Sequence, residues 1–216
     1  MSAVLNKPPR WERRKQSRPA ELLAAALDLF VEHGFAATRL DDVAKVAGVS
    51  KGTLYLYYTS KEDLFRAVVR QNIVPLIDAA RDEIEQSSQP CTVLLEGFFL
   101  EWWQRFGATK LSGILKLVIA EAGNFPEVAD FFLREVATPD RLLLASILQR
   151  GIKGGEFRQF DVEAATSVWL APLVTMVILK HSLDACTVPQ ARVAPHRALA
   201  IHVQMILAAI TRPGQF

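Results

Sequence analysis

Apolar residues recur along this chain at spacings of three and four residues, which is the period of an amphipathic helix. The clearest stripe runs from Leu22 to Phe30, and Gly34 follows it as a natural helix stop. Ser17 and Pro19 suit the start of that helix, because serine caps helices and proline fits a first turn. No segment shows the alternation that is typical of a β-strand. The pattern therefore predicts an all-α protein.

About nine helices are expected. Thr38 and Asp41 fit a capping box for a short second helix, and Ser50 caps a short third one. Gly48 between them permits the left-handed residue that a helix-turn-helix needs. Pro75 is expected to kink the longer fourth helix. The nine predicted helices span residues 17–33, 38–47, 50–58, 60–86, 92–107, 110–122, 127–153, 161–184 and 191–211.

Charge is unevenly distributed along the chain. The formal net charge is only +2, yet residues 1–18 hold six basic residues and a single acid, Glu12. Such an excess is typical of an arm that contacts phosphates, and equally of a solvated tail. We therefore expect three parts: a basic N-terminal arm (1–16), a helix-turn-helix domain (17–64) and a larger C-terminal domain (65–216).

Composition and motifs exclude several classes of protein. The two cysteines, Cys91 and Cys186, are isolated, which suits a reducing cytoplasm and provides no metal-ligand spacing. The four histidines form no ligand pair, and no H-E-x-x-H, nucleophile elbow, P-loop or G-x-G-x-x-G is present. No apolar signal peptide begins the chain, and the longest apolar stretch, 168–179, is too short for a bilayer. We expect a soluble cytoplasmic protein that needs no cofactor or metal and is not an enzyme.

The third helix has the two faces that a DNA-reading helix requires. With Leu54 toward the core, Tyr58 falls beside it, while Gly52 and Leu56 lie nearly opposite. Lys51 stands in the first turn, where it is suited to a phosphate. Gly52 costs roughly 1 kcal/mol against alanine in a helix. Close approach to DNA would justify that cost, but relief of local crowding would justify it too.

The segment around the predicted helix-turn-helix resembles a known family. Between Ala24 and Phe65 the segments A-L-D-L-F-V-E-H-G-F-A-A-T and D-D-V-A-K-V-A-G-V-S-K-G-T-L-Y-L-Y-Y-T-S-K-E-D-L-F closely resemble the DNA-binding domain of tetracycline-repressor-type (TetR family) regulators. The resemblance implies a helix-turn-helix that binds an operator in double-stranded DNA. It implies DNA contacts from Thr38, Ser50, Lys51, Gly52, Thr53, Tyr55, Tyr57 and Lys61.

Two positions depart from the family pattern. Tyr58 stands where phenylalanine is usual, and Leu56 stands where a polar or aromatic residue is more frequent. We expect Leu56 to make an apolar contact, for which a thymine methyl is the natural partner. Further along, L-V-I-A-E-A-G-N-F-P-E-V-A-D-F-F-L-R-E-V, residues 117–136, resembles the C-terminal domain of one subgroup and implies no particular ligand.

Large aromatic residues gather in the C-terminal part. Aromatics at helical spacing are usually plain core, but they also line apolar ligand cavities between helices. The sequence favours Trp102, Trp103, Phe106, Phe125 and Trp169 as ligand-binding residues. The nearest polar candidates along the sequence are Glu121, Asn124, Arg134 and His181, each of which is also suited to a surface or inter-helix contact.

The last two helices are apolar on several faces, so they must be buried on several faces. One face can take the core and another a second subunit, and the resemblance implies that these helices form a four-helix dimer interface. The sequence thus predicts a homodimeric repressor that a small apolar or aromatic effector releases from DNA. The alternatives are an architectural DNA-binding protein, which needs no cavity, and an all-helical enzyme.

Overall fold

The computed structural model describes residues 10–183 and 193–211, with side chains from residue 18 onward. Within these residues every regular element is a helix, and a single isolated bridge pairs Phe157 with Thr211. The predicted all-α class is therefore confirmed. The chain divides into two compact units, one up to Val69 and one from Arg70 onward. The expected boundary at residues 64 and 65 falls inside a helix, α4.

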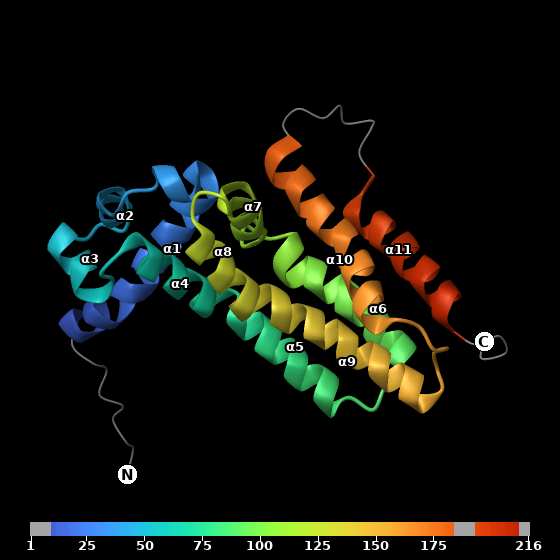
Figure 1. Cartoon of the computed structure of the whole chain (residues 1–216). Coiled ribbons are helices and arrows are strands. Elements are labelled where there is room, and N and C mark those ends of the chain that lie inside the picture. The colour runs from blue at the N-terminus through green and yellow to red at the C-terminus, as the bar shows by residue number, and fades with distance from the viewer. Residues whose placement is uncertain (1–9, 184–192, 212–216) are drawn as a thin grey trace, which may run out of the picture. The chain divides into compact units, whose positions relative to one another are not determined.

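The first unit contains α1 (Arg10–Ala37), α2 (Leu40–Val46), α3 (Lys51–Tyr57) and most of α4 (Lys61–Asn72), as Figure 1 shows. Its core is built on three fully buried rings, Phe30, Phe35 and Phe65. Their centroids lie 5.6 to 5.7 Å apart, one pair stacked and two pairs edge to face. These arrangements are the ones that aromatic quadrupoles favour. The rings join the end of α1 to α4.

Helix α1 begins earlier than the sequence pattern predicts. It starts at Arg10, so Pro19 lies inside it instead of in the first turn. The apolar stripe starts only at Leu22, but arginine, lysine, glutamate and glutamine extend a helix without burying any surface. The predicted basic arm is thus divided: residues 1–9 lie outside the described residues, and 10–16 form the first turns of α1. The regular helix ends at Gly34, whose φ of 84° confirms the predicted stop.

The turn between α2 and α3 is set by local signals. Gly48 takes a φ of 66°, a conformation that side-chain-bearing residues rarely adopt. The next amide, Val49 N–H, donates to the carbonyl of Ala44 at 3.0 Å and closes the end of α2. Ser50 then caps α3, because its Oγ accepts from the Thr53 amide at 3.1 Å. The predicted helix-turn-helix is confirmed.

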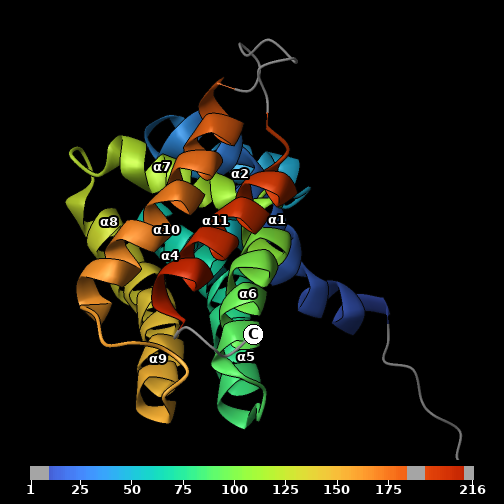
Figure 2. The same ribbon diagram turned by 90° about the vertical axis from the view of Figure 1, so that its right-hand side faces the viewer.

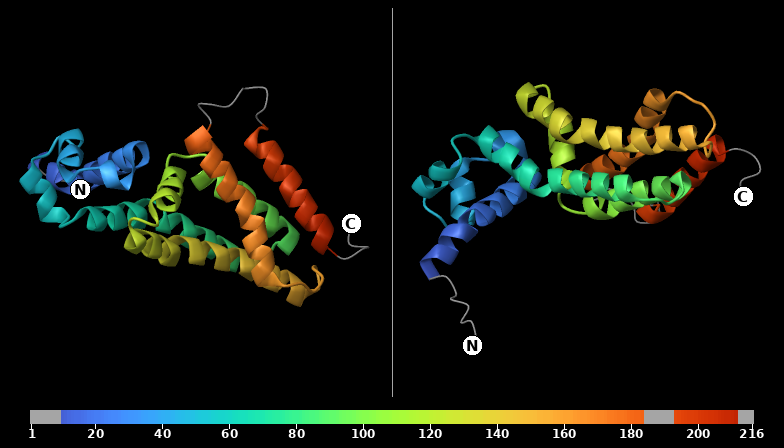
Figure 3. Two further views of the ribbon diagram at one scale, coloured as in Figure 1. Left: turned by 45° about the horizontal axis from the view of Figure 1, so that its top comes forward. Right: turned by 90° about the horizontal axis from the view of Figure 1, so that it is seen from below.

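The second unit is a bundle of longer helices. Figure 2 turns α10 and α11 toward the viewer, and Figure 3 shows α5 and α9 side by side from below. Helix α9 packs against α5, α6 and α10, while α11 packs on α6. The elements are the end of α4, α5 (Val74–Gln86), α6 (Cys91–Trp102), α7 (Ser112–Glu121), α8 (Pro126–Phe132), α9 (Thr138–Gly154), α10 (Val162–Ile178), α11 (Pro195–Ile210) and three π-helical segments, η1 (Trp103–Gly107), η2 (Leu133–Ala137) and η3 (Leu179–Leu183).

The predicted kink near Pro75 is a complete break. Helix α4 ends at Asn72 and α5 begins at Val74, with Pro75 in its first turn. Proline lacks an amide hydrogen and clashes with the carbonyl four residues earlier, so the interruption precedes it. The hinge residue between the two helices is Ile73, which is buried.

The longest apolar helix departs from the sequence expectation. Residues 162–183 form one run of α10 and η3, 22 residues long with a mean hydropathy of 1.8 over its most apolar part. By length and composition alone this run could cross a membrane, in contrast to the expectation that the apolar stretch 168–179 is too short for a bilayer. Only 17% of that part is buried within the described structure. Something outside these residues must therefore cover it.

Candidate DNA-binding surface and ligand cavity

Helix α3 is held to its unit by one face and leaves the other open. Leu54 is fully buried, and the ring of Tyr58 lies beside it in the core. Burial raises the pKa of the Tyr58 hydroxyl. On the opposite face the side chain of Leu56 is 84% exposed, and Tyr55 and Gly52 are exposed with it. The face that the sequence assigns to the DNA groove is therefore the accessible one.

The start of α3 is polar and preorganised. The hydroxyls of Ser50 and Thr53 lie 2.8 Å apart, in addition to the capping bond. Nζ of Lys51 lies 2.9 Å from a carboxylate oxygen of Asp41 on α2. This hydrogen bond raises the pKa of the Lys51 ammonium, which therefore stays charged. Both groups are exposed, so a phosphate can replace Asp41 at little cost.

Two residues that the family resemblance assigns to DNA are engaged inside the first unit. The Thr38 side chain is buried, and its hydroxyl donates to the carbonyls of Leu29 at 3.1 Å and Gly34 at 2.7 Å. The Lys61 ammonium donates to the carbonyl of Ala36 at 3.0 Å and lies 4.6 Å from the centre of the Phe35 ring. Both side chains fasten the end of α1.

Gly52 has no structural reason to lack a side chain. Its φ is not positive, and a Cβ built there would meet only Ser50 Oγ, at an ordinary 3.9 Å. Relief of crowding, the alternative that the sequence left open, is therefore not the explanation. A glycine in a helix costs up to about 1 kcal/mol, so the open space beside it points to a partner outside the chain.

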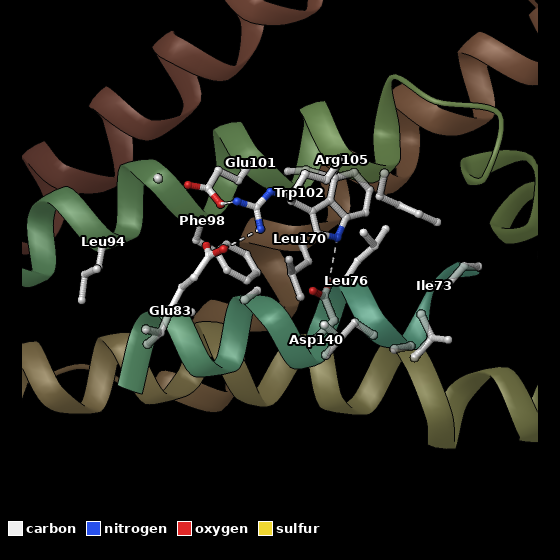
Figure 4. Close-up of a pocket in the computed structure, with 18 of the residues that line it drawn as sticks. Ile73, Leu76, Glu83, Leu94, Phe98, Glu101, Trp102, Arg105, Asp140 and Leu170 are labelled. Carbon is white, nitrogen blue, oxygen red and sulfur yellow. Dashed lines mark hydrogen bonds and ion pairs between the residues drawn. The ribbon is translucent and has the colours of Figure 1, made fainter. Parts of the chain in front are cut away.

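The second unit contains a cavity of about 460 Å³. Its walls come from α5, α6, η1, α9 and α10, together with Phe132 and Val136 from α8 and η2 (Figure 4). The hinge residue Ile73 and the aromatic side chains Phe98, Trp102 and Phe106 are part of the lining. Two π-helical segments, η1 and η2, contribute to it, and π-helical turns are frequent at functional sites. The remaining apolar lining residues are Leu76, Ile77, Ala80, Ile84, Val93, Leu94, Gly97, Leu115, Ala137, Leu170, Leu173 and Val174.

Four charged side chains line the cavity in two groups. Asp140 accepts a hydrogen bond from the indole N–H of Trp102 at 2.9 Å. The two terminal guanidinium nitrogens of Arg105 form ion pairs, Nη1 with Glu83 on α5 and Nη2 with Glu101 on α6, each at 3.0 Å. Figure 4 shows these groups at separate places along the cavity. The Arg105 group is half-exposed and marks where the cavity meets solvent.

The Asp140 carboxyl is isolated from water except through the cavity. The residue keeps some accessible surface because it lines that space, while protein encloses the carboxyl on its other sides. Burial raises its pKa to about 7, against the opposing effect of the Trp102 hydrogen bond. Among the described residues no cation is paired with it.

The structure brings together only part of the predicted ligand site. Trp102 and Phe106 line the cavity, but Trp103, Phe125 and Trp169 do not. Trp169 packs instead against Phe160, with ring centroids 5.6 Å apart. The polar candidates are elsewhere too: His181 lies 2.8 Å from the Ser112 hydroxyl, and Arg134 pairs with Asp130. Glu121 is the last residue of α7 and Asn124 follows that helix; neither residue lines the cavity.

Sequence reasoning missed Asp140, Glu83, Glu101 and Arg105 as lining residues, although Glu101 and Arg105 stand within three residues of Trp102. One signal was available for Asp140. It stands four residues after Val136 and four before Leu144, both buried, so it occupies an apolar helix face. An acid on such a face is unusual enough to indicate a site.

Comparison with known proteins identifies the family. The model described as bacterial regulatory proteins, tetR family, matches residues 22–68, and that of the AefR-like transcriptional repressor, C-terminal domain, matches residues 95–210. The chain belongs to the TetR family of transcriptional regulators. It is therefore a DNA-binding transcriptional regulator. The TetR family is a non-enzymatic family.

Individual relatives agree with this assignment. The HTH-type transcriptional repressor KstR2 of Rhodococcus jostii is 31% identical over 153 residues, which cover 70% of this chain and 74% of KstR2. FadR from Bacillus subtilis, solved with stearoyl-CoA, has a TM-score of 0.70 and 20% identity and covers 88% of this chain and 95% of its own. A regulator from Saccharomonospora viridis, solved with choline, has a TM-score of 0.73 and 18% identity and covers 92% and 99%. At these identities the two structures show the shared fold alone.

The role of Gly52 is directly testable. We expect Gly52→Ala to leave the stability of the protein unchanged or to raise it by up to about 1 kcal/mol, since alanine favours a helix. The added methyl group should nevertheless weaken operator binding at least tenfold, because it occupies space that the DNA backbone or bases need. Fluorescence anisotropy with operator DNA and urea unfolding measure the two effects. Gly154→Ala, in equally open space at the end of α9, is the control. Unchanged operator affinity for Gly52→Ala would show that DNA does not approach this position.

Proposed function

We propose that the protein is a homodimeric repressor that leaves its operator when a small molecule fills the cavity of the second unit. The cavity carries this proposal, because an architectural DNA-binding protein has no use for it. Its volume of about 460 Å³ falls within the range of small-molecule sites, roughly 300–1,000 Å³. KstR2 is named as a repressor, and FadR was solved with stearoyl-CoA. A relative named as a repressor and a structural neighbour solved with a small molecule both support the proposal of a ligand-controlled repressor.

The proposed DNA contacts follow the exposed face of α3. Leu56 would meet a thymine methyl, and Gly52 would let the backbone approach the groove. Thr38 and Lys61 take a supporting role, since their polar groups hold the end of α1. The contacts proposed to act directly are those of Ser50, Lys51, Gly52, Thr53, Tyr55, Leu56 and Tyr57.

The proposed dimer interface is the outer face of α10 and α11. Val168 on α10 is 65% exposed, and Ile201 and Met205 on α11 are 52% and 68% exposed. A groove between the two helices is lined mainly by apolar residues, and at its edge the ring N–H of His202 donates to the carbonyl of Trp169 at 2.9 Å. A second copy would cover the apolar run that a membrane would otherwise have to cover. A dimer would also place two copies of α3 on one operator.

Neighbouring residues of α11 distinguish the interface from the core. Met205 is exposed, whereas Ile206 is buried within its own unit, so the two face different partners. We expect Met205→Glu to give a folded monomer that binds operator DNA poorly, because the carboxylate cannot be buried against a second copy. Ile206→Glu should instead unfold the unit. Analytical ultracentrifugation and circular dichroism separate the two results. Leu142→Glu, on an exposed position of α9, should remain dimeric. A dimeric Met205→Glu protein would contradict the proposed interface.

Ligand and DNA binding are connected in this proposal through α8 and η2. One side of this segment supplies Phe132 and Val136 to the cavity wall. Neighbouring residues hold the last turn of α4: Arg70 makes a two-pronged ion pair with Glu135 at 3.0 and 3.3 Å, and its guanidinium lies 5.2 Å from the Phe131 ring. The paired arginine lowers the pKa of the Glu135 carboxyl, which is therefore ionised at neutral pH. A ligand that displaces the wall would move the end of α4.

The ion pair between Arg70 and Glu135 provides the test. We expect Glu135→Gln to reduce ligand-induced loss of operator affinity several-fold, while ligand affinity changes little. A ligand can shift the equilibrium only through its differential affinity for two arrangements, and this contact transmits that difference. Operator affinity would be measured with and without a compound selected from an apolar and aromatic library, on an operator located by footprinting. Asp130→Asn, which removes the exposed pair with Arg134 on the same segment, is the matched control. An unaltered ligand response in Glu135→Gln would reject this route.

A further inference from the structure

The charges that line the cavity are unbalanced. Three lining residues are acids, Glu83, Glu101 and Asp140, and only one, Arg105, is a base. Arg105 is shared between Glu83 and Glu101, so the half-exposed end of the cavity carries a net negative charge when those carboxylates are ionised. Asp140 adds a further acid deeper in the same space. A carboxylate or phosphate on a ligand would meet repulsion at both places.

Asp140 has unused capacity for a partner. A carboxylate offers about four lone-pair sites, and the described residues fill one of them, through the indole of Trp102. Besides the Arg105 group, Ser87 and Gln89 are the other polar lining residues, and among the described residues neither is hydrogen-bonded to this carboxyl. Without a cation beside it, a buried carboxyl favours its protonated, uncharged form. A cation beside it favours the ionised form.

Aromatic rings surround the same region. Phe98, Trp102, Phe106 and Phe132 all line the cavity, and the rings of Trp102 and Phe106 meet edge to face with centroids 5.2 Å apart. The faces of such rings attract cations, most strongly in tryptophan, and the attraction grows where water is excluded. The same rings accept an alkyl or aromatic body by burial of apolar surface.

We propose that the effector of this cavity is an amphipathic organic cation, an amine or quaternary ammonium with an alkyl or aromatic body, whose charged head lies against Asp140 and Trp102. This inference specifies the ligand class of the proposed sensor and rests on that function. It also separates this chain from FadR, which was solved with stearoyl-CoA, because an ionised Asp140 repels an anionic head group.

The proposal also predicts how the affinity for the cation depends on pH. The neighbouring charged groups are Glu83 on α5, Glu101 on α6 and Arg105 on η1, while the lining residues of α10 are apolar and no histidine lines the cavity. Asp140 is thus the lining group expected to change protonation near pH 7, where burial places its pKa. A bound cation favours the ionised carboxylate, so binding expels a proton below that pH. Affinity for the cation should rise about tenfold from pH 6 to pH 8, following the ionised fraction of Asp140.

The experiment compares head groups on one tail. Octyltrimethylammonium, 1-octanol and octanoate would be titrated into the full-length protein by calorimetry at pH 8. We expect the cation to bind at least tenfold more tightly than the alcohol, and octanoate to bind most weakly. For the cation alone, affinity should rise with pH, and at pH 6, where Asp140 is mostly protonated, the heat should depend on the ionisation enthalpy of the buffer. Equal affinities for cation and alcohol, tighter binding of octanoate, or no binding of the cation at millimolar concentration would overturn the proposal.

Asp140→Asn isolates the carboxylate, because asparagine keeps the shape and still accepts from Trp102. In this variant the cation should fall to the affinity of 1-octanol and lose its pH dependence, while binding of 1-octanol stays within about twofold. Asp78→Asn, which removes an acid of α5 that does not line the cavity, should behave as the wild type. A preference for the cation that survives in Asp140→Asn would overturn the proposal. Thermal unfolding confirms that each variant is folded.

Operator affinity is measured separately, with and without the cation. Cation binding that needs Asp140 but leaves operator affinity unchanged would refute the proposed sensor function while the ligand class stands. Release of operator DNA by octanoate, and not by the cation, would retain a sensor and refute the ligand class. The two proposals therefore fail in different ways.

Discussion

A cavity between helices persists only if something keeps its walls from closing. Protein interiors are close-packed, and apolar walls without a ligand gain contacts by moving together. Here Arg105 joins Glu83 on α5 to Glu101 on α6, and Arg150 of α9 donates to the carbonyls of Ile84 and Gln89 at 3.1 and 3.0 Å. Exposed ion pairs contribute only about 0–1 kcal/mol each to stability. Their importance in this unit is geometric, since they fix the spacing of α5, α6 and α9 around the cavity.

The helices held at this spacing connect the cavity to α4. The cavity wall begins at Ile73, the residue between α4 and α5, and includes α8 and η2. The neighbours of those wall residues hold Arg70, on the last turn of α4. Helix α4 in turn belongs mostly to the first unit, whose ring cluster includes Phe65. In the proposed mechanism a displaced wall therefore acts on the DNA-binding unit through the covalent continuity of α4.

How much the sequence predicts depends on how local the signals are. The helix-turn-helix follows from Gly48, Ser50 and Leu54, which act on residues within one or two helical turns. The all-α class and the positions of most helices follow from periodicity for the same reason. The early start of α1 was missed because the apolar stripe begins only at Leu22, and periodicity detects a helix through its apolar face.

The cavity could not be predicted in the same way. Its walls come from residues as far apart in the sequence as Ile73 and Val174, and periodicity does not say which helix each face will meet. Trp169 is as apolar as Trp102, yet it packs on Phe160. Asp140 was missed because no aromatic residue lies near it in the sequence, although Trp102 contacts it in the fold. The same limit applies to Met205 and Ile206, whose different environments depend on the packing of α11.

We propose that filling the cavity rearranges the two DNA-binding units of a dimer, and a distance between those units would reveal it. Spin labels at Lys45→Cys, an exposed position on α2, would report the separation of the two units in a Cys186→Ser background, with Cys91 buried. We expect octyltrimethylammonium to shift the distance distribution by several ångströms away from the one seen on operator DNA, where the recognition helices are spaced by about 34–36 Å. An identical distribution with the cavity saturated and operator released would contradict it.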